Sequence, residues 1–176
     1  MRIKSWVSFV LLAAALRGVA QDAVPLASGK LLKASVSHGR TVLSIPGLPG
    51  GKSHLSVERD ATVNANSKPA TITLVGEIPG SLLVLTDVYP SIAGGLSYCQ
   101  AGTESFLRVI SISGLRPHET YSTKLESCRD NIELASPGVK WLSATNTLEI
   151  HWISAPGKAG QTENRTLVLG ANGKPQ

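Results

Sequence analysis

The sequence predicts an all-β protein: a small β-sandwich or barrel-like antiparallel domain that follows a cleaved signal peptide. Three observations carry the fold class. Short runs rich in Val, Ile, Leu and Thr recur along the chain, turns rich in Gly and Pro separate them, and no sustained helical period follows residue 20.

Residues 1–20 have the three-part layout of a secretory signal peptide. Basic residues stand near the start, residues 6–16 form an uncharged apolar run of 11 residues, and small residues precede a cut after Ala20. A transmembrane helix needs about 20 apolar residues, so this run is too short to anchor the chain. We expect residues 21–176 to form a single β-rich domain with flexible ends and no membrane span.

Removal of the signal peptide changes the charge of the protein. The whole chain has 17 basic and 12 acidic residues, and three of the basic residues lie in the first 20 positions. The mature chain therefore has 14 basic and 12 acidic residues, a net charge of +2, and its basic residues are scattered. This distribution does not favour nucleic acid as a partner.

The alternation of apolar and polar residues places the expected strands. Residues 147–153 are the clearest case, because every second residue from Leu148 onward is large and apolar. Residues 81–88 and 105–113 are apolar on both faces, which is typical of central strands. The other strands are expected at 30–36, 41–45, 53–59, 71–75, 120–128 and 165–169.

Turns and loops are expected between these strands. Asp130 or Asn131 is able to cap one short helical turn at 129–135, and residues 61–70 are expected to form an exposed loop. The Gly- and Pro-rich turns are expected at 46–51, 78–80, 93–95, 136–138, 155–157 and 170–173.

Cys99 and Cys128 are the only cysteines, and both lie in the mature chain. An even count in an exported protein predicts one disulfide. It closes a loop of about 30 residues, which contributes about 3.5 kcal/mol of stability in the chain-entropy model. Two cysteines without histidines at ligand spacing do not predict a zinc site.

No sequence motif predicts catalysis, a metal site or a cofactor. The four histidines include no pair at i, i+4, no Gly-x-Ser-x-Gly nucleophile is present, and nothing singles out a pair of carboxylates. We therefore assign no catalytic residue, no metal ligand and no cofactor, and we favour a protein that is not an enzyme.

The candidate binding segment is residues 87–104. It holds Asp87, Tyr89, Tyr98 and Glu104 among several glycines, and the expected disulfide pins it. Tyrosines on a rigidly supported loop give a large contact area at low entropy cost, so we predict a contact loop here.

These features favour an exported, non-enzymatic binding protein, such as an inhibitor, an immunity protein or an envelope-interaction protein. Its expected partner is another envelope or secreted protein, and its location is the periplasm in a Gram-negative host and the outside of the cell otherwise.

Two alternatives remain open. One is a small hydrolase of envelope polymers that uses Asp87, Glu104, His54 or His151 as acid or base. The other is a structural subunit that associates through a sheet edge.

Overall fold

Eleven β-strands and no helix make up the part of the chain that the structure describes. The computed structural model describes residues 23–48, 53–57, 60–64, 66–92, 99, 102–158, 160–170 and 172–176. The predicted signal peptide lies outside these residues, and none of them belongs to a helix that is long and apolar enough to cross a membrane. The all-β class predicted from the sequence is confirmed.

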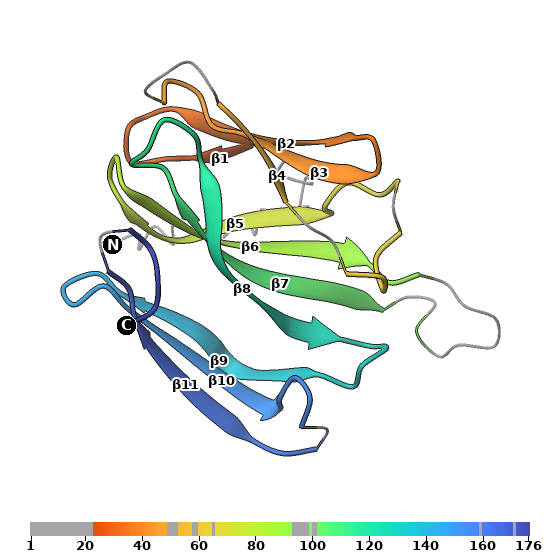
Figure 1. Ribbon diagram of the computed structural model, residues 1–176. Coiled ribbons are helices and arrows are strands. Elements are labelled where there is room, and N and C mark those ends of the chain that lie inside the picture. The colour runs from red at the N-terminus through yellow and green to blue at the C-terminus, as the bar shows by residue number, and fades with distance from the viewer. Residues whose placement is uncertain are drawn as a thin grey trace, which may run out of the picture.

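The strands form three antiparallel sheets (Figure 1). The N-terminal sheet contains β1 (Ala23–Pro25), β2 (Leu31–Ser37), β3 (Arg40–Ser44) and β4 (His54–Val57) in chain order. The middle sheet contains β5 (Thr71–Ile78), β6 (Leu82–Pro90), β7 (Thr103–Ser111) and β8 (His118–Ser127), also in chain order. The C-terminal sheet has the order β11 (Glu163–Val168), β10 (Thr147–Ser154) and β9 (Glu133–Leu142).

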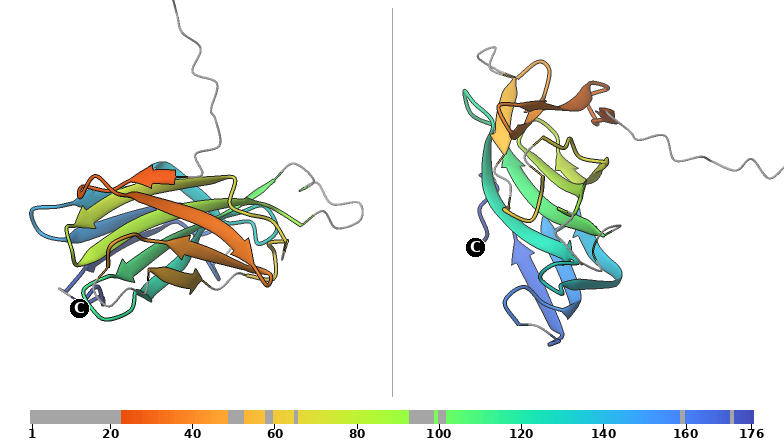
Figure 2. Two further views of the ribbon diagram at one scale, coloured as in Figure 1. Left: turned by 90° about the horizontal axis from the view of Figure 1, so that it is seen from above. Right: turned by 90° about the vertical axis from the view of Figure 1, so that its right-hand side faces the viewer.

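The middle sheet lies between the other two sheets, and both of its faces are buried (Figures 1 and 2). Leu82 and Val84 of β6 pack in one apolar core with residues of the C-terminal sheet such as Trp152. The intervening Leu83 and Leu85 pack in a second core with residues of the N-terminal sheet. Adjacent strand residues point to opposite faces, so β6 contributes to two cores at once. The expectation that residues 81–88 and 105–113 form central strands is confirmed.

Nine strands overlap the predicted ones, whereas β1 and β9 are not among them. β9 contains Pro137, whose segment the sequence predicts to be a turn. Val139 pairs with Ile150 and Leu134 pairs with Trp152, so the residues between Leu134 and Val139 bulge out of the register. Because β9 is an edge strand and bulged, Pro137 is tolerated without a ladder donor.

The expected helical turn at 129–135 is a hairpin turn instead. Ser127 and Ile132 exchange backbone hydrogen bonds of 3.0 Å in both directions. Asn131 lies in the turn with a positive φ of 54°, a conformation that asparagine adopts more readily than most residues. This turn leads directly from β8 into β9.

The chain ends that the sequence predicts to be flexible include paired backbone. Leu169 and Pro175 form an isolated antiparallel bridge. The Thr120 hydroxyl of β8 donates a 2.8 Å hydrogen bond to the carbonyl of Gly173. The last residues therefore pack against the middle sheet. At the other end, Val24 of β1 is buried in the core under the N-terminal sheet.

The predicted disulfide between Cys99 and Cys128 is present, with a Cα–Cα distance of 5.7 Å. It ties the connection between β6 and β7 to the turn between β8 and β9. Gly102 leaves room for it, because a Cβ on Gly102 would stand 2.7 Å from the Cβ of Cys128. The bridge therefore holds Cys99 against the turn that follows β8, at the edge of the middle sheet.

The burial of both faces of β6 predicts that the adjacent residues Leu82 and Leu83 contribute similarly to the stability of the fold. We expect Leu82→Ala and Leu83→Ala each to lower the free energy of unfolding by about 2–5 kcal/mol, because each opens a cavity in a different core. Urea unfolding of both variants measures this. Leu31→Ala, at a β2 side chain that is 46% exposed, is the control and costs less than about 1 kcal/mol. A mild effect of either buried variant contradicts the three-layer packing.

Candidate binding site

Four segments that are distant in sequence meet at one end of the molecule, which we call the loop end (Figure 1). They are residues 60–64, the ends of the β6–β7 connection, the β8–β9 turn and the β10–β11 turn. The Ile92 amide donates to the Thr62 carbonyl at 3.0 Å, and the Arg129 guanidinium donates to the Ile92 carbonyl at 3.2 Å. The Ser154 hydroxyl donates to the Asn131 carbonyl at 2.6 Å. The segments are thus bonded to one another as well as adjacent.

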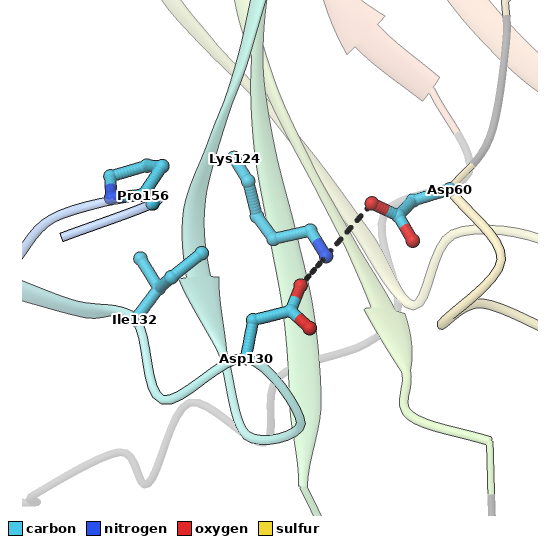
Figure 3. Close-up of a pocket in the computed structure, with 6 residues that line it drawn as sticks. Asp60, Lys124, Asp130, Ile132 and Pro156 are labelled. Atoms are coloured by element: carbon cyan, nitrogen blue, oxygen red, sulfur yellow. Dashed lines mark hydrogen bonds and ion pairs between the residues drawn. The ribbon is translucent and has the colours of Figure 1, made fainter. Parts of the chain in front are cut away.

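A cavity of about 570 Å³ opens at the loop end (Figure 3). Its wall combines charged side chains with apolar surface. The lining residues are Asp60, Lys124, Asp130, Ile132, Pro156 and Gly157.

Lys124 of β8 is the central charged group of this cavity. Its ammonium is 2.9 Å from Asp60 Oδ2, forms a second ion pair with Asp130 and donates to the Thr62 hydroxyl at 3.2 Å. Figure 3 shows the ammonium between the two aspartates. Burial acts to lower the pKa of Lys124, but its hydrogen bonds to Asp130 and Asp60 and the negative charges of both carboxylates together outweigh burial and raise the pKa. Lys124 therefore stays charged at neutral pH.

Glu104 of β7 supports Lys124 from inside the protein. Its side chain is fully buried, and Oε1 accepts a 2.6 Å hydrogen bond from the Ser91 hydroxyl. Oε2 lies 3.7 Å from the Lys124 ammonium and has no hydrogen bond. Three carboxyl groups thus surround one ammonium, and the formal charge of this group, which we call the Lys124 cluster, is −2.

A second buried charge network lies beside the Lys124 cluster. Arg108 Nε donates to both carboxylate oxygens of Asp87, at 3.0 and 2.8 Å, and its Nη1 donates to Glu119 at 2.7 Å. The Tyr89 hydroxyl donates to Asp87 at 2.6 Å. Burial and the neighbouring Asp87 carboxylate raise the pKa of Tyr89, so its phenol keeps the proton that it donates.

Phe106 joins the two networks. The Arg108 guanidinium carbon is 5.3 Å from the centre of its ring, and the Lys124 ammonium is 5.7 Å from it. Both distances fit cation–π contacts, which strengthen when the cation is removed from water. The charged wall of the cavity is therefore continuous with a buried polar layer on the middle sheet.

The sequence predicts that residues 87–104 form one loop, but in the structure both ends of this segment belong to strands. Asp87 and Tyr89 lie in β6 and Glu104 lies in β7, where Tyr89 pairs directly with Glu104. The three side chains are buried, and Arg108, Thr41 and Ser91 form hydrogen bonds with Asp87, Tyr89 and Glu104 Oε1 respectively. Tyr98 lies outside the described residues. The structure thus brings three of the four predicted residues together, but behind the surface, and their role in partner contact stays a prediction.

Asp60, Lys124 and Asp130 are the site residues that sequence reasoning misses. Lys124 falls in a predicted strand and Asp130 in a predicted turn, and neither position carries a pattern that marks a buried ion pair. Only the turn after β8, closed by the Ser127–Ile132 bridge, brings Asp130 back to Lys124, six residues earlier. No local signal indicates that Asp60 joins them.

The acids and bases of the hydrolase alternative are spread over the molecule. His54 lies in β4 and His151 in β10, in the two outer sheets, while Asp87 and Glu104 are buried in the middle sheet. Among the described residues, no group of three or more histidine, cysteine or acidic side chains is arranged to hold a metal ion.

No family model matches this chain, and neither the curated proteins nor the solved structures contain a match for it. The chemistry of the site is therefore inferred from its own residues. Those residues offer paired carboxylates, one neutralised ammonium and an apolar wall.

The Lys124 cluster predicts that replacing Lys124 lowers the free energy of unfolding more than replacing the exposed Lys158 does. Lys124→Met leaves the fully buried Glu104 without a cation, so we expect a loss of about 3 kcal/mol in the free energy of unfolding. Lys158→Met removes a lysine that is 55% exposed and paired with Glu163, and we expect less than about 1 kcal/mol. Equal costs in denaturant unfolding would show that Lys124 is not paired inside the protein.

Asp60 makes the cluster sensitive to acid. Burial acts to raise the pKa of Asp60, but the hydrogen bonds from Lys124 and Thr62 and the charge of Lys124 together outweigh it and hold the pKa below its ordinary value of 3.8. A carboxyl whose pKa is lower in the folded protein stabilises the fold above its unfolded pKa, and this stabilisation is lost as the pH falls through the folded value.

We therefore expect the stability difference between wild type and Asp60→Asn to be constant from about pH 5 to pH 9 and to shrink below 3.8. Lys124 does not alter this plateau, because its pKa is raised above 10.5. Urea unfolding at a series of pH values tests the prediction. A difference that persists at pH 2 would contradict it.

Proposed function

We propose that this chain is an exported binding protein, not an enzyme, that recognises another envelope or secreted protein through its loop end. One observation carries the proposal. Residues 60–64, the β8–β9 turn and the β10–β11 turn, which are distant in sequence, contribute with Lys124 to the wall of one cavity, and the buried Glu104 of the middle sheet supports its charged part.

The charges of the cavity support binding more than stability. Removing Lys124 and Glu104 from water costs several kcal/mol per ion, and well-packed apolar residues often replace a buried ion pair without loss of stability. The apolar side chains of Val63 and Phe106 lie beside these charges, so apolar packing is available next to this position. Charges that face a cavity give a partner something specific to recognise.

The loop end is also pre-organised. The Cys99–Cys128 disulfide and the hydrogen bond from Arg129 to Ile92 hold Cys99 and Ile92, two described residues of the β6–β7 connection, against the β8–β9 turn. A surface that is ordered before binding loses less conformational entropy when a partner docks. Binding loops on a rigid β scaffold are a common solution for the same reason.

The two alternatives have less support from the geometry. A lysine whose pKa is raised is a poor base or nucleophile at neutral pH, and the carboxyl groups around it are already paired. The edge strand β11 is only six residues long and carries Glu163 and Arg165, features that discourage pairing through a sheet edge.

Site-specific photocrosslinking in the native host tests the proposal. The full chain is expressed with p-benzoylphenylalanine in place of Ala61, an exposed residue beside Asp60. We expect one dominant protein to crosslink at this position, because the loop end is the contact surface.

The matched control places the same crosslinker at Leu115, in the turn between β7 and β8 at the opposite end of the molecule. Leu115 is 78% exposed, so it samples chance encounters at least as well as Ala61. The proposal fails if position 61 captures no protein or if both positions capture the same set.

A further inference from the structure

The cavity at the loop end has two kinds of wall. Asp60 and Asp130 form a polar rim, with side chains 37% and 46% exposed, and each directs one carboxylate oxygen at Lys124. Ile132 and Pro156 form apolar wall. Such a cavity complements a group that has a hydrocarbon stem and a cationic head.

The cluster also has more negative charge than its lysine neutralises. Lys124 is the one cation paired with Asp60, Asp130 and Glu104 among the described ion pairs. Glu104 Oε2 points at this ammonium, fully buried and without a hydrogen bond. An anion entering the cavity would meet a lysine that three carboxylates already neutralise, whereas a cation would meet unbalanced negative charge.

The acidic surface continues beyond this cavity. A second hollow of about 280 Å³ shares Ile132 with the first and is lined by Glu126 and Glu133 as well as the β8–β9 turn. Lys158, which shares Glu163 with Arg165, and Arg129 of the β8–β9 turn offset part of this charge. The five carboxyl groups that line or support the two hollows still outnumber Lys124, Arg129 and Lys158 by two. Because the mature chain as a whole has a charge of +2, the acidity is a local property of the loop end.

We infer that the cavity accepts a basic side chain, arginine or lysine, that the partner protein presents. This inference rests on the proposed function and names the chemistry by which the partner is recognised. The cationic head pairs with the carboxylates of Asp130 and Asp60 from the cavity side, away from the Lys124 ammonium that lies between them. The methylene stem packs on Ile132 and Pro156. Lys124 stays in place and holds the two aspartates in position for the incoming charge.

An NMR titration of the mature protein with hexa-arginine tests the inference, with hexa-glutamate as the matched probe of opposite charge. We expect saturable shifts of the backbone amides of Asp60, Asp130 and Gly157 with hexa-arginine and none with hexa-glutamate. The affinity falls as salt is raised, because the rim is partly exposed.

Asp130→Asn is the decisive variant, because it removes one rim charge and leaves Lys124 paired with Asp60 and Glu104. We expect it to weaken hexa-arginine binding roughly fivefold or more. Glu149→Gln makes the same change on β10, outside the loop end, and we expect less than a twofold effect. Equal effects of the two variants, or shifts spread evenly over the surface, would overturn the inference.

The two proposals fail separately. A partner that crosslinks at position 61 while Asp130→Asn leaves hexa-arginine binding unchanged overturns the basic-side-chain inference and leaves the binding function standing. Saturable hexa-arginine binding without any crosslinked partner supports the cavity chemistry and counts against a dedicated protein partner.

Discussion

The two central strands of the middle sheet, β6 and β7, have no face that is open to water, and the rest of the structure depends on this constraint. Each side chain on them has to be apolar or has to find a polar partner inside the protein. Over most of their length they supply leucine, valine and isoleucine to two cores. Towards the loop end, the face of the middle sheet that packs on the N-terminal sheet carries Asp87, Glu104 and Arg108, which are buried and paired.

The candidate site is therefore an extension of the core. Phe106 lies against the cations of both buried networks, and Glu104 connects the sheet to Lys124 at the cavity wall. Asp60 and Asp130 reach the same ammonium from two other segments, and the disulfide holds the third segment beside them. Positions that face solvent are thus fixed by contacts that begin in the interior. This arrangement holds the charged wall of the cavity in place from the interior of the protein.

Much of the fold was predictable because it depends on local pattern, whereas most of the site depends on contacts across the chain. The two-sided apolar runs at 81–88 and 105–113 identify central strands, and the cysteine count predicts the disulfide. β9 was not predicted, because Pro137 lies within it and a bulged edge strand that contains proline resembles a turn in sequence. Polar Asp87 and Tyr89 suggest a loop because their partners, Arg108 and Thr41, are distant in the chain. Asp60 joins Lys124 only through the tertiary fold.

Native-state hydrogen exchange is the most direct measurement of whether the charged end of the middle sheet is part of one cooperative core. The account predicts that the amides of Asp87, Glu104 and Arg108 exchange with the same free energy as those of Leu83 and Leu107, because all five open only in global unfolding. Exchange of the three charged positions at a clearly lower free energy would contradict it. The loop end would then open on its own, and the cavity would not be pre-organised.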